Sequence, residues 1–157
     1  MFFIGGGAIA VVVCGGIISF FAYIAAVGPE TSVYTSNRIP SRFLRTIESI
    51  GALDKDEKIQ FFYSDALTDI RDGFYFVSNK KVVLYSQTTD SPLTKISFKD
   101  IMDVDMIRDE SFFEDSEITL YLHDGQVHSF PVSSEHDRDK QFLNAIKNQS
   151  INASESQ

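Results

Sequence analysis

The chain has 157 residues, 43% of them hydrophobic and 23% charged, which suits one globular domain and excludes a wholly disordered chain. Its 14 Lys and Arg against 22 Asp and Glu give a formal net charge of −8, which argues against nucleic-acid binding because phosphates require clustered Lys and Arg. The single cysteine excludes an intrachain disulfide and a zinc site built from several cysteines.

The N-terminal segment, residues 2–28, contains no charged side chain and ends at Pro29 and Glu30. Because about 20 apolar residues span a bilayer as a helix, this segment predicts a transmembrane helix that anchors the protein. The alternative is a cleaved secretory signal, which normally begins with Lys or Arg and has a shorter apolar core. Neither feature is present, so we expect a retained anchor.

The charges that flank this segment predict its orientation. No Lys or Arg precedes it, whereas Arg38, Arg42 and Arg45 follow it closely. Positively charged flanks stay in the cytoplasm. We therefore expect a single-pass protein of the cell (inner or plasma) membrane, with its N-terminus outside and its C-terminal domain in the cytoplasm.

Small residues recur within the predicted span at intervals of four, namely Gly6, Ala10 and Cys14. This spacing lets two membrane helices approach closely, which indicates a homodimer or a partner in the membrane. The alternative interpretation is that Gly is simply frequent in membrane helices.

Two short segments connect the predicted span to the rest of the chain. Residues 29–40 are expected to form a polar linker, and residues 41–51 to form a short amphipathic helix that Gly51 ends. The apolar stripe of this helix consists of Phe43, Leu44, Ile47 and Ile50. We expect the stripe to pack on the domain that follows. Alternatively, the helix lies on the membrane surface with Arg42 and Arg45 toward the lipid.

Apolar alternation between turn residues predicts seven short strands in the next part of the chain. They cover residues 58–63, 73–78, 82–86, 93–98, 101–108, 117–123 and 126–132. Asp124 and Gly125 form a strong signal for a tight two-residue hairpin between the last two strands.

The hydrophobic period then changes to that of a helix, from residue 133 or 134 to about residue 148. Phe142, Leu143 and Ile146 form its apolar stripe, so one side is expected to be buried. Residues 149–157 are polar and are expected to form a disordered tail. This order of elements predicts a strongly bent sheet or barrel that the C-terminal helix closes.

Residues 72–85 read DGFYFVSNKKVVLY and resemble the strand–turn–strand signature of bacterial pleckstrin-homology-like (PH-like) domains. In that signature a glycine opens an apolar strand, Thr or Ser and a polar turn follow, and a basic residue begins the next strand. This chain has Ser78 where Thr is usual and Lys81 where Arg is usual. Residues 93–101 are similar to the segment that leads into the fifth strand of the family. The resemblance covers about residues 53–148 and implies a mainly-β PH-like barrel of about seven antiparallel strands, capped by a C-terminal helix.

The resemblance says little about the ligand, since this fold serves lipid, peptide and protein binding alike. PH domains that bind phosphoinositides carry several Lys and Arg in the loop between their first two strands. Here that loop, residues 64–72, has one Arg and three Asp, so anionic headgroups would be repelled. Lys80 and Lys81 form a small basic turn elsewhere, which is either a lipid or anion contact or a solvated hairpin turn.

Residues 103–117 are strongly acidic and contain Phe112 and Phe113. Two adjacent phenylalanines among charged residues indicate either an exposed tip that binds a partner or an anchor that holds the loop on the core. The acidic residues lack the spacing of a calcium loop, and the sequence contains no recognisable catalytic set. We therefore expect no metal, no cofactor and no enzymatic activity.

The function that follows from these observations is a non-catalytic, membrane-anchored binding or scaffold module that presents a cytoplasmic PH-like domain to a protein partner. The expected docking surfaces are the exposed edge strands and the loop of Phe112 and Phe113, through strand addition or apolar insertion. One alternative is a lipid-sensing domain that acts on its own membrane through Lys80, Lys81 and the helix of Arg42 and Arg45. A second alternative is an enzyme whose site is not recognisable in the sequence.

Overall fold

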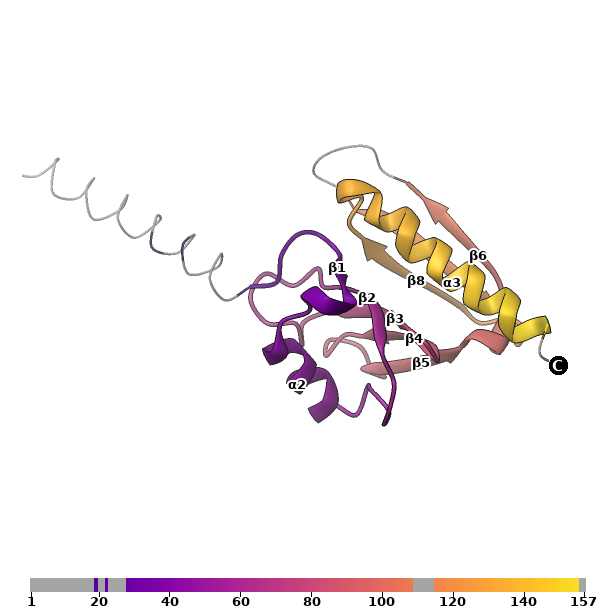
Figure 1. The fold of residues 1–157 in the computed structure, drawn as a ribbon, viewed down its shortest axis with the longest axis horizontal. Coiled ribbons are helices and arrows are strands. Elements are labelled where there is room, and N and C mark those ends of the chain that lie inside the picture. The colour runs from indigo at the N-terminus through magenta and orange to yellow at the C-terminus, as the bar shows by residue number, and fades with distance from the viewer. Residues whose placement is uncertain (1–18, 20–21, 23–27, 109–114, 156–157) are drawn as a thin grey trace, which may run out of the picture.

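The computed structural model describes residues 28–108 and 115–155, together with residues 19 and 22 (Figure 1). Its strands form a five-stranded sheet in the order β1-β2-β3-β4-β5 and a three-stranded sheet in the order β6-β7-β8, and every pairing is antiparallel. The first sheet comprises β1 (Tyr34–Thr35), β2 (Ile59–Tyr63), β3 (Phe74–Ser78), β4 (Lys81–Tyr85) and β5 (Leu93–Ser97). The second comprises β6 (Ile101–Ile107), β7 (Ser116–Leu122) and β8 (Val127–Val132). The helices are α2 (Ser41–Ser49) and α3 (Arg138–Glu155), with 3-10 turns η1 (Ser36–Arg38), η2 (Phe98–Asp100) and η3 (Glu135–Asp137).

The five-stranded sheet is buried on both of its faces. Successive side chains of a strand point to opposite faces, so a strand covered on both sides needs an almost continuous apolar run. In β3, Phe74 and Phe76 belong to one apolar cluster, whereas Tyr75 and Val77 belong to the other. This double burial explains why β3 and β4 are apolar from Phe74 to Val77 and from Val82 to Tyr85 instead of alternating with polar residues.

The N-terminal part of the described chain covers the outer face of this sheet. Phe43 and Ile47 of α2 are buried there, and Leu44 and Ile50 pack against the same cluster. The rings of Phe43 and Phe62 stack with their centroids 5.9 Å apart. The apolar stripe of α2 thus lies on the sheet, and Figure 1 shows the helix beside it.

The inner face of the five-stranded sheet packs against the three-stranded sheet and α3. Figure 1 shows α3 running along β6 and β8 of this sheet. Phe142 and Ile146 of α3 are fully buried in the shared cluster. The Phe142 ring lies 6.3 Å from that of Phe61 in β2 and 5.9 Å from that of Phe130 in β8, so it joins elements of both sheets. These contacts position α3 next to the edge strand β6.

The expected closed barrel is wrong. The strands lie in two open sheets, and β5 and β6 are not paired with each other in the described part of the chain. The physical reason is the 3-10 turn η2, which carries the chain from the edge of one sheet to the edge of the other. Local alternation identifies strands, but it does not say which of their edges meet.

The expected transmembrane helix at residues 2–28, with Gly6, Ala10 and Cys14, lies outside the described residues except at positions 19, 22 and 28. In the part of the chain that is described, no helix has the length and apolarity to cross a membrane. We therefore correct the expectation of a single-pass, membrane-anchored protein with a cytoplasmic domain. The longest described helix, α3, has 18 residues and a largely polar surface.

Two further segments differ from expectation. Residues 29–40 contain β1, which pairs with β2, and they bury Tyr34 and Ile39, so they are more than a polar linker. Residues 149–155 continue α3, where a disordered tail was expected. Ala153 packs against the inner cluster, which gives the last turns of the helix an apolar contact despite their polar composition.

Candidate functional site

The surface between β6 and the C-terminal half of α3 forms a groove. It consists of two adjoining hollows of about 270 and 470 Å³. We call it the β6–α3 groove, and it is lined by Ile101, Met102, Asp103, Val104, Asp105, Tyr121, Lys147, Ser150 and Ile151. Met102 and Ile151 are 60% and 55% exposed, which is unusual for such large apolar side chains. The groove therefore offers apolar surface beside a strand edge.

The strand wall of the groove is an edge strand. Within the described residues β6 pairs only with β7, so its other edge is free of strand partners. The register between the two strands shifts between Ile101 and Asp103. The residue at this irregularity, Met102, is exposed toward the groove, since an extra residue in a strand redirects side chains.

Two backbone N–H groups of β6 are bonded to side chains instead of to a strand. The N–H of Val104 donates to Oδ1 of Asp103 over 2.8 Å, and the N–H of Met106 donates to Oδ1 of Asp105, also over 2.8 Å. In an antiparallel pair every second residue turns its N–H and C=O away from the partner strand. Val104 and Met106 are therefore the residues that present backbone groups to the free edge, and the two carboxylates cover their donors.

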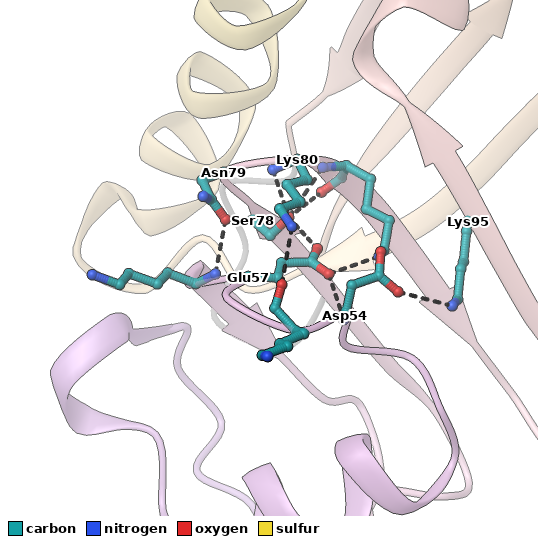
Figure 2. Close-up of polar contacts among 9 residues, drawn as sticks. Asp54, Glu57, Ser78, Asn79, Lys80 and Lys95 are labelled. Atoms are coloured by element: carbon teal, nitrogen blue, oxygen red, sulfur yellow. Dashed lines mark hydrogen bonds and ion pairs between the residues drawn. The ribbon is translucent and has the colours of Figure 1, made fainter.

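The turn between β3 and β4 forms a second polar site, shown in Figure 2. Lys81, only 7% exposed, points its ammonium inward. Its Nζ donates to Oδ2 of Asp54 over 2.5 Å and to Oε2 of Glu57 over 2.7 Å. The Glu57 side chain is fully buried, and its Oε1 accepts from the hydroxyl of Ser78 over 2.5 Å. Lys95 lies 3.6 Å from Oδ1 of Asp54. These residues form an internal ion cluster.

The electrostatics of the cluster keep its charges in place. Burial alone would lower the pKa of Lys81, but the hydrogen bonds to Asp54 and Glu57 outweigh it and raise the pKa above its ordinary value. The hydrogen bond from Lys81 lowers the pKa of Asp54. Lys81 and Asp54 are therefore charged at neutral pH, and their hydrogen-bond partners lie within the protein.

The structure does not gather the residues expected to contact lipid or anions. Lys81 is enclosed by carboxylates, and Nζ of the exposed Lys80 donates to the backbone oxygen of Lys55 over 3.1 Å. Arg42 lies 4.9 Å from the centre of the Phe43 ring and lines a hollow with Thr68 and Asp69. That hollow includes Arg42 and Phe43 from the first turn of α2, whereas Asp54, which Lys81 contacts, follows the last turn in the chain.

Arg45 is exposed on α2. Phe112 and Phe113 lie outside the described residues. Among the residues that the structure describes, no group of three or more His, Cys, Asp or Glu side chains is arranged to hold a metal ion.

Two tyrosine–carboxylate pairs were not anticipated from the sequence. The Tyr63 hydroxyl donates to Oδ2 of Asp115 over 2.5 Å, and the Tyr75 hydroxyl donates to Oδ2 of Asp65 over 3.2 Å. Burial raises the pKa of Asp115; the Tyr63 hydrogen bond opposes this, and the charge of Asp65 adds to it. The alternation of β2 and β3 places both tyrosines on the inner face, but it carries no signal for Asp115, which is 52 residues from Tyr63.

The two antiparallel sheets and the helix that follows them define a mainly-β PH-like fold. Residues 53–148 match the family described as Bacterial PH domain, and the chain belongs to this family. The resemblance to bacterial PH-like domains is thus confirmed, without the membrane anchor that was expected beside it. The comparisons point to no catalytic family, and PH domains are generally non-enzymatic.

Two solved structures are similar to this chain. A protein of the DUF1696 family with a pleckstrin-homology domain, from Shewanella loihica PV-4, is 14% identical with a TM-score of 0.50, and the match covers 76% of this chain and 96% of that one. A pleckstrin homology domain from Shewanella amazonensis SB2B is 15% identical with a TM-score of 0.48, covering 70% and 86%. At these identities the first likeness concerns the fold alone. No curated protein matches the chain.

Proposed function

We propose that this chain is a non-catalytic binding module that recognises an extended protein segment by strand addition to β6. The PH-like fold is consistent with a binding module. The observation that carries the proposal is the free edge of β6, whose outward N–H groups at Val104 and Met106 lie beside the β6–α3 groove.

The groove has the properties that strand addition requires. An added strand takes its affinity from main-chain hydrogen bonds and its specificity from pockets for alternate side chains. The edge of β6 supplies the main-chain groups, and Met102 and Ile151 supply apolar walls. An apolar side chain of the bound segment would cover both of these walls, which otherwise face water.

The charges around the domain favour a protein partner over an anionic lipid. The loop between β2 and β3 contains Asp65, Asp69 and Asp72, and its Arg71 is bonded to Asp69. Lys81 is already bonded to internal carboxylates. With a net charge of −8, the chain would repel an anionic headgroup at this loop.

The proposal is tested with peptides selected from a displayed random library on the full-length protein. We expect selected peptides to protect the amides of Val104 and Met106 from hydrogen exchange. Met106→Pro removes an outward N–H without touching the β6–β7 ladder, because proline is tolerated where the N–H faces away from the sheet. Loss of this bond is expected to weaken peptide binding about fivefold to tenfold.

Met106→Ala is the matched control, since it shortens the same side chain and keeps the N–H. Binding to this variant is expected to stay within about twofold to threefold of the wild type. The proposal fails if selected peptides bind Met106→Pro as tightly as Met106→Ala, or if protection appears away from β6.

A further inference from the structure

The outward N–H groups on the free edge of β6 already have hydrogen-bond acceptors, and these acceptors restrict which segment can bind there. The carboxylates of Asp103 and Asp105 already accept the outward N–H groups of Val104 and Met106. A strand that adds to this edge brings its own carbonyl oxygens to the same donors. Both carboxylates must then leave these N–H groups, and each keeps its negative charge beside the new strand.

The charges of Asp103 and Asp105 are not balanced by ion pairs within the described part of the chain. Neither Asp103 nor Asp105 forms an ion pair among the residues described. The residues of β7 that pair with Asp103 and Asp105 are Tyr121 and Thr119, and both are uncharged. Lys147 of α3 lines the same groove, but it is one ammonium for two carboxylates.

We infer, resting on the proposed function, that β6 selects an extended segment with Lys or Arg at two alternate positions, where these side chains meet Asp103 and Asp105. The two carboxylates are two residues apart on one strand, which is the side-chain period of any added strand. Opposite charges that face each other across a strand pair stabilise the pairing, and like charges destabilise it. Strand addition displaces the two carboxylates from the edge N–H groups. Basic side chains on the added strand then pair with the displaced carboxylates, so a basic segment is favoured.

A neutral or acidic segment fits this edge less well. Its carbonyl oxygens replace the carboxylates at the N–H groups of Val104 and Met106, but the freed charges gain no new partner. Glu117, which pairs with Ile107 at the next position along the sheet, adds further negative charge to this region. An acidic segment would therefore face repulsion from three carboxylates.

The test uses three synthetic peptides of equal length, capped at both ends, in which Val alternates with Lys, Gln or Glu. Binding to the full-length protein is measured by fluorescence anisotropy at low and high salt, and amide exchange at Val104 and Met106 locates the peptide. We expect the Lys peptide to bind about tenfold more tightly than the Gln peptide, the Glu peptide to bind most weakly, and the Lys preference to shrink with salt.

Two double variants separate the charge of the two carboxylates from their role as hydrogen-bond acceptors for the edge N–H groups. Asp103→Asn with Asp105→Asn keeps an oxygen that can accept from each N–H but removes the charge, so the Lys preference should fall to about twofold. Asp103→Ala with Asp105→Ala removes both the charges and the side-chain acceptors of the edge N–H groups. This variant should therefore bind the Gln peptide several-fold more tightly than the wild type does, with no Lys preference.

The matched control is Asp90→Asn with Asp124→Asn, which removes two charges elsewhere on the exposed surface and should retain the full Lys preference. Exchange of the buried ladder amides verifies that each variant is folded. If all three peptides bind equally and protect Val104 and Met106, the inference is overturned while the proposed function stands.

If the Lys peptide binds without protecting these two amides, its attraction to the acidic chain is non-specific, and both proposals are overturned. The amides of Val104 and Met106 could also be protected in the protein alone, at concentrations where sedimentation shows a dimer. A second copy of the chain would then be the partner bound at the β6 edge. That outcome also overturns the inference of a basic partner.

Discussion

The ammonium of Lys81 serves two carboxylates at once, and this explains why a charged residue can begin a buried strand. Transfer of a charge out of water is costly unless partners compensate for it. Asp54 and Glu57 compensate Lys81, and the hydroxyl of Ser78 satisfies the second oxygen of Glu57. The adjacent Lys80 lies outside this cluster and is exposed. Two neighbouring lysines thus have different environments.

Lys81→Met is expected to lower the free energy of unfolding by about 3 kcal/mol, because it leaves the buried carboxylate of Glu57 without its cation. Urea denaturation at neutral pH measures this loss. Glu57→Gln in the same chain should recover part of the stability, since it removes the uncompensated charge.

Lys80→Met is the matched control on the next residue, and its effect should stay within about 0.5 kcal/mol. Equal effects of Lys80→Met and Lys81→Met would contradict the assigned role of the cluster. So would a Glu57→Gln variant that fails to improve the stability of Lys81→Met.

At the scale of elements, α2 is the cover of the outer face of the five-stranded sheet. Phe62, Phe74 and Phe76 of the sheet are fully buried in the cluster to which Phe43 and Ile47 of α2 belong. α2 ends at Ser49, and Gly51 follows its C-cap residue Ile50 with a φ of 74°, in the left-handed region that glycine adopts readily. The N–H of Ala52 reaches back to the carbonyl of Ile47 over 3.1 Å and closes the helix end.

Ile47→Ala is expected to lower the free energy of unfolding by about 3 kcal/mol, because Ile47 is fully buried between α2 and the sheet and its truncation leaves a cavity. Glu48→Ala, at the next and exposed position of the same helix, is the control and should change stability by less than about 0.5 kcal/mol. Thermal or urea unfolding compares the two. A small effect of Ile47→Ala would show that α2 is not part of the cooperative core.

At the scale of the whole molecule, two tyrosines of the five-stranded sheet reach across the inner cluster to residues in or next to the second sheet. The ring of Tyr75 in β3 stacks on Phe130 of β8 with centroids 5.3 Å apart. The hydroxyl of Tyr63 in β2 donates to Asp115, the residue before β7. This second contact depends on pH, because Asp115 titrates.

Burial raises the pKa of Asp115 in the folded protein above its ordinary value of 3.8, and the charge of Asp65 raises it further. The folded state therefore holds the proton more tightly than the unfolded state, and the stability from Asp115 is lost as the pH rises from about 4 through the folded pKa. Asn at this position keeps an acceptor for Tyr63 and does not titrate. The stability of the wild type relative to Asp115→Asn should consequently fall over this pH range and then level off.

Urea denaturation of both proteins at steps of pH from 3 to 8 checks this prediction. A stability difference that stays constant with pH, or one that rises with pH, would contradict the direction of the pKa shift. Tyr63→Phe is a useful control: it removes the hydrogen bond that opposes the shift, so the fall should extend to higher pH.

The strands were predictable because their signals are local. The strand at residues 73–78 is observed as Phe74–Ser78, where apolar residues lie between a glycine and a polar turn. The hairpin at Asp124 and Gly125 was placed correctly, but Leu122 bonds to Gln126, so its loop has one more residue than expected. The strand β1 was missed because it has two residues, Tyr34 and Thr35, in a polar segment. Its strand character comes only from pairing with β2.

The sequence by itself determined the strand segments from β2 to β8, the C-terminal helix and the resemblance that the family match confirms over residues 53–148, since each depends on the order of neighbouring residues. Only the tertiary structure decided which strand edges pair and which stay free, because these contacts join residues far apart in the chain. Lys81 looked like an exposed basic turn until Asp54 and Glu57 were seen to surround it. The free edge of β6 likewise depends on where β5 and α3 lie, which no local pattern reports.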